Sequence, residues 1–293
     1  MMRTLDTSTS LRIAVQKSGR LTEKTLNLLE AIGFRFDDYK RSLLIRSRNF
    51  DVELLLIRDD DIPEYVEDGV CDLGFVGANV RAEDGADVTV LKGLDYGVCR
   101  LSLAAPKSGA IRTAKDFSGK KVATSYPKLT KAWFDKREVD VEIVTISGSV
   151  EIAPLLEVAD AICDLVSTGN TLKANGLLEL DTIFESETEL IRTNKPLSDG
   201  KQQLIQKILQ RIDGHQTAEK SRYIMMNAPS DAIPKIREII PSLKSPTIVP
   251  LADDGMVAIH TVVPISTFWD VMEKLKEAGA SGIVMLPIES MIA

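Results

Sequence analysis

Strands and helices alternate in the hydrophobic pattern of the first part of the chain. Leu11–Val15 predicts a short strand, and apolar residues then recur at helical spacing from Leu21 to Ile32. Val52–Ile57 is a continuous apolar run, which is typical of a parallel strand covered on both faces. Asp72–Gly77 predicts a further strand that ends in glycine. This alternation predicts an α/β fold.

The middle of the chain repeats one arrangement, in which a strand runs through a turn of small residues into a helix. The strand that begins at Lys120 leads to a helix from Pro127, and the strand Val141–Ile146 leads to a predicted helix over Ile152–Val158. Such turns gather at the carboxyl edge of an open sheet, where ligands bind. Val98–Ala104 is expected to be a crossover strand into a second unit, and Leu178–Arg192 is expected to form strands. Ser198–Ile212 predicts a helix, and its return after the second unit suggests two lobes joined by crossover strands.

The C-terminal part predicts the order β-α-β-β-α-β, which is the ferredoxin-like arrangement. We therefore expect lobe I to comprise residues 1–97 together with 193–218, lobe II residues 98–192, and a ferredoxin-like domain residues 219–293. The predicted elements of that domain are Tyr223–Met226, Asp231–Ile240, Thr247–Pro250, Val257–Val263, Ser266–Ala278 and Ile283–Ile288.

Composition narrows the class of protein. The 293 residues carry a net charge of −7, which argues against nucleic-acid binding. No apolar run approaches the ~18 residues of a membrane span, and Met1–Ser10 is polar without the apolar core of a signal peptide. A cytoplasmic location is therefore expected.

The few cysteines and histidines limit which metal sites and catalytic groups the chain can form. Cys71, Cys99 and Cys163 have no C-x-x-C spacing, so neither a disulfide framework nor a zinc site is indicated. His215 and His260 are the only histidines, which argues against a histidine-based triad. Any metal should be a hard cation held by oxygen ligands and substrate phosphates.

The stretch Ala161–Gly176 reads as a strand, a polar loop and the start of a helix. Backbone N–H groups in such a loop can bind a phosphate, and Gly169 allows the backbone to approach it closely. Asp164 accepts hydrogen bonds when ionised, so it suits sugar hydroxyls or the water shell of a metal. Together these residues could hold the two ends of a phosphorylated ribose. An ordinary polar loop is the alternative.

Basic and acidic side chains follow other strands. Lys17 and Arg20 flank a glycine after the first strand, where they form either a solvated turn or a clamp for phosphates. Asp72 is expected either to face the cleft or to be a structural acid.

Many ordered motifs resemble the long form of the ATP phosphoribosyltransferases. The resemblance covers nearly the full chain, with Ala161–Gly176 similar to the family's phosphoribosyl-diphosphate (PRPP) loop. Two departures are Ala78, where a Glu is common, and Asn170, where Ala or Arg is usual. The other matching stretches are Gln16–Arg20, Arg58–Pro63, Cys99–Ala104, Ala123–Pro127, Gly148–Glu151, Lys201–Gln203, Tyr223–Met226, Pro246–Ile248 and Met285–Glu289.

The resemblance implies a two-lobed, periplasmic-binding-protein-like catalytic part. It also implies the first reaction of histidine biosynthesis, in which ATP and PRPP give N1-(5-phosphoribosyl)-ATP and pyrophosphate with Mg²⁺. Asp164 and Glu151 would hold the ribose, with Mg²⁺ held mainly by substrate phosphates. The 5-phosphate of PRPP would be bound by Ser167, Thr168, Gly169, Asn170 and Thr171. Residues expected on the ATP or phosphate side are Lys17, Arg20, Asp72, Arg100, Thr124, Ser125 and Tyr126.

The resemblance further implies feedback inhibition by histidine at the C-terminal domain, with a shift between active dimers and inhibited hexamers. The equivalent positions are Asn227, Leu243, Thr247, Thr261 and Val262, for which a core or interface role is the alternative.

Two other classes of function remain open from the residues alone. A solute-binding protein without catalysis would also have two lobes around a cleft, although the polar N-terminus argues against export. A ligand-sensing regulator could use the C-terminal domain as its sensor, although net acidity argues against DNA binding.

Overall fold

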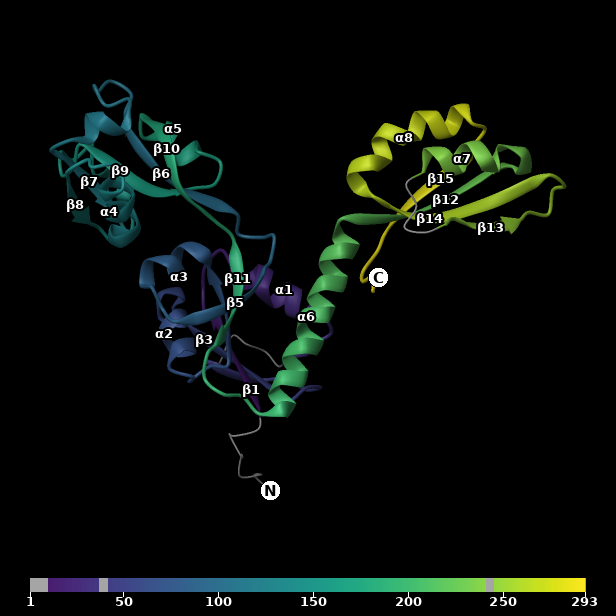
Figure 1. Ribbon diagram of the computed structural model, residues 1–293, viewed down its shortest axis with the longest axis horizontal. Coiled ribbons are helices and arrows are strands. Elements are labelled where there is room, and N and C mark those ends of the chain that lie inside the picture. Colours follow the sequence, from purple (N-terminus) through teal and green to yellow (C-terminus); the bar gives the residue numbers. More distant parts are fainter. Residues whose placement is uncertain (1–9, 37–41, 241–244, 293) are drawn as a thin grey trace. The chain divides into compact units, whose positions relative to one another are not determined.

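The protein is described by a computed structural model that covers residues 10–36, 42–240 and 245–292. The chain divides into two compact units, Met1–Glu30 with Phe34–Gln202 and Ala31–Gly33 with Gln203–Ala293 (Figure 1). The first unit holds two separate sheets and the second unit holds one.

The first sheet is built around β1 (Leu11–Gln16), which pairs in parallel with β3 (Val52–Ile57) and β4 (Leu73–Gly77). The strand order is β2-β3-β1-β4-β11-β5. β3 is largely buried, as its continuous apolar sequence predicts. The other elements of this lobe are α1 (Thr22–Ala31), β2 (Leu44–Arg46), the 3₁₀ turn η2 (Asp59–Asp61), α2 (Ile62–Glu67), α3 (Ala78–Asp84), β5 (Val88–Gly93) and β11 (Thr188–Thr193).

The second sheet has the order β10-β6-β9-β7-β8. β7 (Lys120–Thr124) runs parallel to both β8 (Val141–Thr145) and β9 (Ala161–Val166), so three carboxyl ends share one edge. β6 (Cys99–Pro106) is antiparallel to β9 and brings its amino end to the same edge. The other elements are η3 (Ala114–Phe117), α4 (Pro127–Asp135), η4 (Val150–Ile152), α5 (Asn170–Ala174) and β10 (Leu177–Ser186).

The chain passes between the two sheets twice, from β5 to β6 and from β10 back to β11. This confirms the predicted class of two α/β lobes joined by crossover segments. The return passage lies at Glu187, a few residues before the expected boundary at 192. The reason is that Leu190 and Ile191 are buried in the first sheet, where they pair with Phe75 and Gly74.

The C-terminal unit confirms the predicted ferredoxin-like order. Its antiparallel strands are arranged β13-β14-β12-β15, and alternate residues such as Ile224, Met226 and Ile259 pack with Phe268 and Leu275 of one helix. Helices therefore cover one face of the sheet. The elements are β12 (Ser221–Pro229), η5 (Ser230–Ala232), α7 (Ile233–Ile239), β13 (Thr247–Pro250), β14 (Met256–Pro264), α8 (Ile265–Glu277) and β15 (Ser281–Pro287).

Two predicted helices differ from the structure: one is only a turn, and the other is longer than predicted. The sequence predicts a helix over residues 152–158, but the chain there forms a single turn that follows η4. This turn ends at Glu157, which has a left-handed φ of 56°. The Val158 N–H donates to the Ala153 carbonyl, the bond that closes a Schellman-type helix end. α6 (Asp199–Glu219) extends past the predicted Ile212, and from Gln203 onward it belongs to the C-terminal unit.

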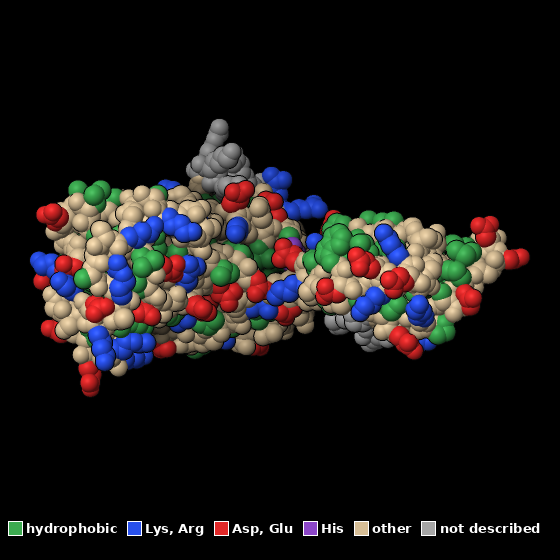
Figure 2. Space-filling model, turned by 90° about the horizontal axis from the view of Figure 1, so that it is seen from above, with side chains coloured by type: hydrophobic (Ala, Val, Ile, Leu, Met, Phe, Trp, Pro, Cys, Tyr) green, Lys and Arg blue, Asp and Glu red, His purple; other side chains and the backbone are tan. Residues whose placement is uncertain are grey.

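None of the helices in the described ranges is long and apolar enough to cross a membrane. On the face shown in Figure 2, the coloured Lys and Arg side chains are interspersed with Asp and Glu side chains.

Candidate active site

The polar loop after β9 lies at the edge where the strands of the second sheet have their carboxyl ends. Ser167 and Thr168 are exposed, and Gly169 adopts a φ of 76° before the short helix α5. The Thr168 hydroxyl accepts a hydrogen bond from the Asn170 N–H at 3.5 Å. Leu172 is buried and fixes α5 to the lobe. A loop of this kind presents amides and hydroxyls to an anion.

Asp164 and Glu151 are close enough to influence each other. Asp164 lies near the end of β9, and its Oδ1 accepts the Leu165 N–H at 2.8 Å. Burial raises the pKa of the Asp164 carboxyl, the negative charge of Glu151 raises it further, and Arg20 opposes the rise. Glu151 is the middle residue of η4, and Ser149, with a left-handed φ of 50°, directly precedes η4. The charges of Glu151 and Arg20 therefore both act on the Asp164 carboxyl.

The segment after β7 is held by internal hydrogen bonds. Thr124 is fully buried, and its hydroxyl accepts the Tyr126 N–H at 2.9 Å, so it shapes the turn. Ser125 donates to the Ile146 carbonyl at 2.7 Å. Burial raises the pKa of the Tyr126 phenol, and the charges of Asp164, Asp59 and Asp60 add to the rise. The Tyr126 phenol is therefore within electrostatic range of these three carboxylates.

Lobe I holds this segment through α3. The Asn79 side chain donates to the Tyr126 hydroxyl at 2.8 Å, and Ser186 donates to Asn79 at 2.7 Å. The Glu83 carboxylate accepts the backbone N–H groups of Lys128 and Leu129 at 2.7 and 2.9 Å. The carboxylate of one lobe thus caps a helix of the other.

The cations predicted to contact phosphates differ in their surroundings. Lys17 and Arg20 are exposed beyond the end of β1, and the Lys17 N–H donates to the Ile57 carbonyl at 2.7 Å. The guanidinium of Arg100 is instead bound to Glu179 and to the carbonyl of Ser167. Lys17 and Arg20 are thus better placed for a ligand than Arg100.

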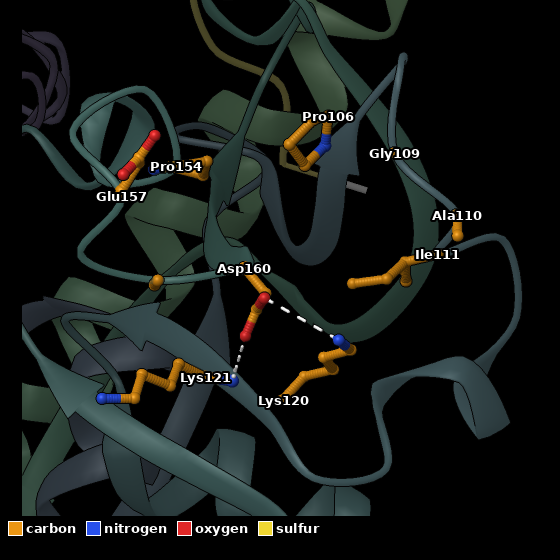
Figure 3. A pocket seen from close by; sticks show the side chains of 10 residues that line it. Pro106, Gly109, Ala110, Ile111, Lys120, Lys121, Pro154, Glu157 and Asp160 are labelled. Atoms are coloured by element: carbon orange, nitrogen blue, oxygen red, sulfur yellow. Dashed lines mark hydrogen bonds and ion pairs between the residues drawn. The ribbon is translucent and has the colours of Figure 1, made fainter.

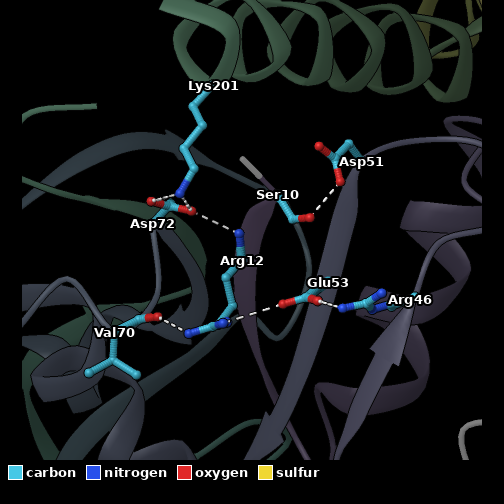
Figure 4. Close-up of polar contacts among 8 residues, drawn as sticks. All are labelled: Ser10, Arg12, Arg46, Asp51, Glu53, Val70, Asp72 and Lys201. Carbon is cyan, nitrogen blue, oxygen red and sulfur yellow. Dashed lines mark hydrogen bonds and ion pairs between the residues drawn. The ribbon is translucent and has the colours of Figure 1, made fainter. Parts of the chain in front are cut away.

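Asp72 is a structural acid. Its carboxylate accepts two bonds from the Lys201 ammonium at 2.9 and 2.8 Å and one from the Arg12 N–H at 2.8 Å (Figure 4). It lies just before β4, at the amino end of the strand, whereas the loops above follow carboxyl ends. Burial and these partners fit the alternative that the sequence left open for Asp72, a structural acid.

A cavity of about 530 Å³ lies at the opposite edge of the second sheet (Figure 3). Its lining includes Lys120, Lys121 and Asp160, at the amino ends of β7 and β9. Asp160 accepts the Lys121 N–H at 2.8 Å and forms an ion pair of 3.9 Å with Lys120. The cavity is therefore separate from the loop that follows β9.

The residues predicted to bind histidine lie on two faces of the C-terminal sheet. Thr261 is 6% exposed and lies on the face that the helices cover. Val262 follows it in β14 and therefore points to the open face, where Asn227 of β12 also lies. Thr247 is exposed on β13, at the edge of the sheet. Leu243 lies outside the described residues.

The carboxylates near the loop suit a metal ion that takes most of its ligands from substrate phosphates and water. Within the described ranges no cluster of three or more His, Cys, Asp or Glu side chains could hold an ion. Asp164 and Glu151 offer two carboxylates, which fits Mg²⁺ that takes its remaining ligands from phosphates and water.

Sequence reasoning missed Glu179, Asn79 and Glu83. Each acts through another residue: Glu179 holds Arg100, Asn79 holds Tyr126, and Glu83 caps α4. The signal for Glu179 was a carboxylate within an apolar strand shortly after the loop. Asn79 and Glu83 had no comparable signal, because their partners lie in the other lobe.

Comparisons with known proteins agree with this architecture. A family model described as ATP phosphoribosyltransferase matches residues 58–214, and one described as the HisG C-terminal domain matches residues 218–290. The ATP phosphoribosyltransferase of Bacteroides fragilis is 47% identical, with 96% of this chain and 99% of the relative covered. That of Phocaeicola vulgatus is 46% identical over the same shares.

A solved structure has the same catalytic fold. A chain of the HisG:HisZ ATP phosphoribosyltransferase complex from Thermotoga maritima superimposes with a TM-score of 0.61 and 30% identity. The match covers 69% of this chain and 98% of that chain. The match of the C-terminal domain model to residues 218–290 is what makes this chain a long form. The chain thus belongs to the ATP phosphoribosyltransferase family, in its long form with a C-terminal domain.

Proposed function

We propose that this chain joins ATP to PRPP, giving N1-(5-phosphoribosyl)-ATP and pyrophosphate, in the first step of histidine biosynthesis. The observation that carries the proposal is the cluster at the end of β9. There the charges of Glu151 and Arg20 both act on Asp164, which lies near the end of β9, just before the loop 167–171. The loop would bind the 5-phosphate and the carboxylates would bind the ribose hydroxyls.

The proposed reaction needs positioning and charge more than proton transfer. The N1 lone pair of adenine attacks C1 of the ribose, and the C1–O bond to the diphosphate breaks with its electron pair leaving on pyrophosphate. Because N1 carries no proton, no general base is required. Asp164 and Glu151 would stabilise the positive charge that develops on the ribosyl centre. Lys17 and Arg20 would bind the leaving diphosphate or the ATP phosphates.

Mg²⁺ is the proposed cofactor. It would neutralise the diphosphate and so make it a better leaving group. Asp164 and Glu151 are the side chains of this chain that would share in holding it, directly or through water. Ser125 and Tyr126 are proposed to line the nucleotide side, and Tyr126 is held in place for this by Asn79.

The remaining assignments concern the whole chain. We propose residues 1–97 with 193–218 as lobe I, 98–192 as lobe II and 219–293 as the regulatory domain. Histidine is the proposed feedback inhibitor, dimers and hexamers are the proposed assemblies, and the cytoplasm is the proposed location.

Release of pyrophosphate tests the proposal. The purified chain should release it only when ATP, PRPP and Mg²⁺ are all present, and the purine product should appear in equal amount. Binding of ATP or PRPP without pyrophosphate release would instead support a solute-binding or sensing protein. Release from PRPP alone would indicate a hydrolase and contradict the proposed transfer.

A further inference from the structure

We infer that Glu179 is a positioning residue that fixes Arg100 against the loop 167–171 and so holds that loop in its phosphate-binding shape. The inference rests on the proposed function for its consequence in catalysis. It assigns Arg100 a different part from the phosphate contact that the sequence suggests.

The Glu179 carboxylate holds the Arg100 guanidinium with two parallel bonds. Arg100 Nε donates to Glu179 Oε1 at 2.5 Å, and Arg100 Nη2 donates to Oε2 at 2.7 Å. This fork geometry is the strongest form of ion pair between side chains, and a lysine cannot reproduce it. The pair holds the pKa of the Glu179 carboxyl below its ordinary range, chiefly through these bonds to Arg100.

A buried hydroxyl fixes the carboxylate from the other side. Ser102 is fully buried on β6, and its hydroxyl donates to Glu179 Oε1 at 2.8 Å. Ser102 is also the register partner of Asp164 in β9. The Ser102 side chain therefore links Glu179 of β10, whose register partner on β6 is Ala104, to the position on β6 that pairs with Asp164.

The third bond of Arg100 reaches the loop itself. Arg100 Nη1 donates to the Ser167 carbonyl at 3.2 Å, where β9 ends and the loop begins. Arg100 is the register partner of Val166, so the guanidinium lies beside the loop's first residue. A Cβ placed on Gly169 would lie 4.0 Å from Glu179 Oε2, which brings the carboxylate close to the loop's turn as well.

Electrostatics explain why the two residues must act together. A lone carboxylate this close to the loop would repel the phosphate that the loop is proposed to bind. A lone guanidinium would be free to swing toward that phosphate or toward solvent. Paired, the two charges cancel, and the guanidinium keeps its remaining N–H groups on the loop side. The pair thus shapes the loop without competing for its ligand.

The test compares E179Q with a matched control, E189Q. Glu189 of β11 forms the same type of fork with Arg81 of α3, at 2.5 and 3.2 Å, in the other sheet. We expect E179Q to raise the KM for PRPP about tenfold, the range of a lost charge-assisted bond, with the KM for ATP unchanged and kcat reduced less. E189Q should leave the KM for PRPP at the parent value.

Two further measurements distinguish a positioning role of Glu179 from a general loss of structure in the variant. Amide hydrogen exchange should quicken at residues 167–171 in E179Q and not in E189Q. R100K should raise the KM for PRPP by a similar factor. The double variant E179Q/R100K should have a KM for PRPP no higher than either single variant, because each substitution already breaks the same ion pair.

Several outcomes would overturn the inference. If Arg100 binds phosphate itself, releasing it in E179Q should leave or lower the KM for PRPP, while R100K alone raises it. Equal exchange rates at the loop in E179Q and the parent would also refute it. Lack of pyrophosphate release by the parent chain would refute the proposed function instead, and the exchange comparison would still test the pair.

Discussion

The ionised carboxylate of Asp164 lowers the stability of the fold but serves the proposed reaction. Its carboxylate lies where burial and Glu151 both disfavour the ionised form, yet the proposed mechanism uses that form to stabilise a cation. Its pKa is higher in the folded than in the unfolded chain. The stability that this shift contributes is present below the ordinary value of 3.8 and is lost as pH rises through the folded pKa. At neutral pH the charge therefore lowers stability.

Asp164→Asn should accordingly separate activity from stability. We expect turnover to fall on the order of 100-fold, because a preorganised charge at the reacting centre is lost. The melting temperature at neutral pH should stay the same or rise. Steady-state kinetics and thermal denaturation of the same preparation measure both. Near-normal turnover would remove Asp164 from the site.

The activity of the parent chain should also depend on this group in acid. As pH falls, Asp164 takes up a proton at a pKa above 3.8 and the ribose site loses a charge. The logarithm of kcat/KM for PRPP should therefore decline on the acid side, starting at higher pH than an ordinary aspartate would give. In D164N, the residual activity should not show this decline at acid pH. If D164N shows the same decline, a group other than Asp164 causes it.

Gly169 can be tested against a glycine of the same lobe. Both Gly169 and Gly176 have left-handed φ values, 76° and 68°, so alanine at either position should cost about 1 kcal/mol of stability. Only Gly169 lies within the proposed phosphate loop. We expect G169A to raise the KM for PRPP and G176A to leave it unchanged. Equal effects of both variants on KM would show that the loop's conformation is not specific to binding.

At the scale of elements, α3 of lobe I supports α4 of lobe II. Glu83→Gln removes one of the two carboxylate oxygens that accept the Lys128 and Leu129 N–H groups. We expect a loss of about 1 kcal/mol, the usual worth of a helix cap. We also expect a raised KM for ATP, since the Ser125–Tyr126 turn leads into α4.

A capping acid in η3, which precedes the amino end of β7, provides the control. Asp116 accepts the backbone N–H groups of Arg112 and Thr113 at the start of a 3₁₀ turn. Asp116→Asn should weaken that turn and leave the KM for ATP unchanged. If E83Q and D116N behave alike in kinetics, α3 has no part in shaping the nucleotide side.

Elements with strong patterns were predictable, and those fixed by tertiary contacts were not. The strands Val52–Ile57 and Thr247–Pro250 have the predicted bounds, since continuous or β-branched runs determine them locally. Residues 152–158 show a helical apolar spacing, yet Leu155 and Leu156 are 78% and 62% exposed and Glu157 ends the turn. Periodicity predicts a helix only where the apolar face is buried.

At the scale of the whole molecule, the order of elements sufficed to predict both folds. The βαββαβ order and the alternation of strands and helices are properties of the chain itself. The pairing of Asp72 with Lys201, 129 positions later, is not, because distant partners follow from the finished fold. Glu179 could not be predicted for the same reason, because its partner Arg100 lies 79 positions earlier in the chain.

The C-terminal unit allows a sharp test of regulation, because its candidate residues lie on opposite faces. Millimolar histidine should lower the rate of the parent chain and raise its apparent mass. Asn227→Ala, on the open face, should raise the inhibitory histidine concentration about tenfold with the uninhibited rate unchanged, because a hydrogen-bonding amide is lost.

The control for that variant is Thr261→Val, which removes a hydroxyl from the face that the helices cover while keeping the side-chain shape. A ligand that binds the open face does not reach this hydroxyl, so T261V should retain the parent's response to histidine. If T261V loses the response and N227A keeps it, histidine binds by opening the covered core. If neither variant alters inhibition, the binding site lies elsewhere, and the open face of the sheet is available for contacts between chains.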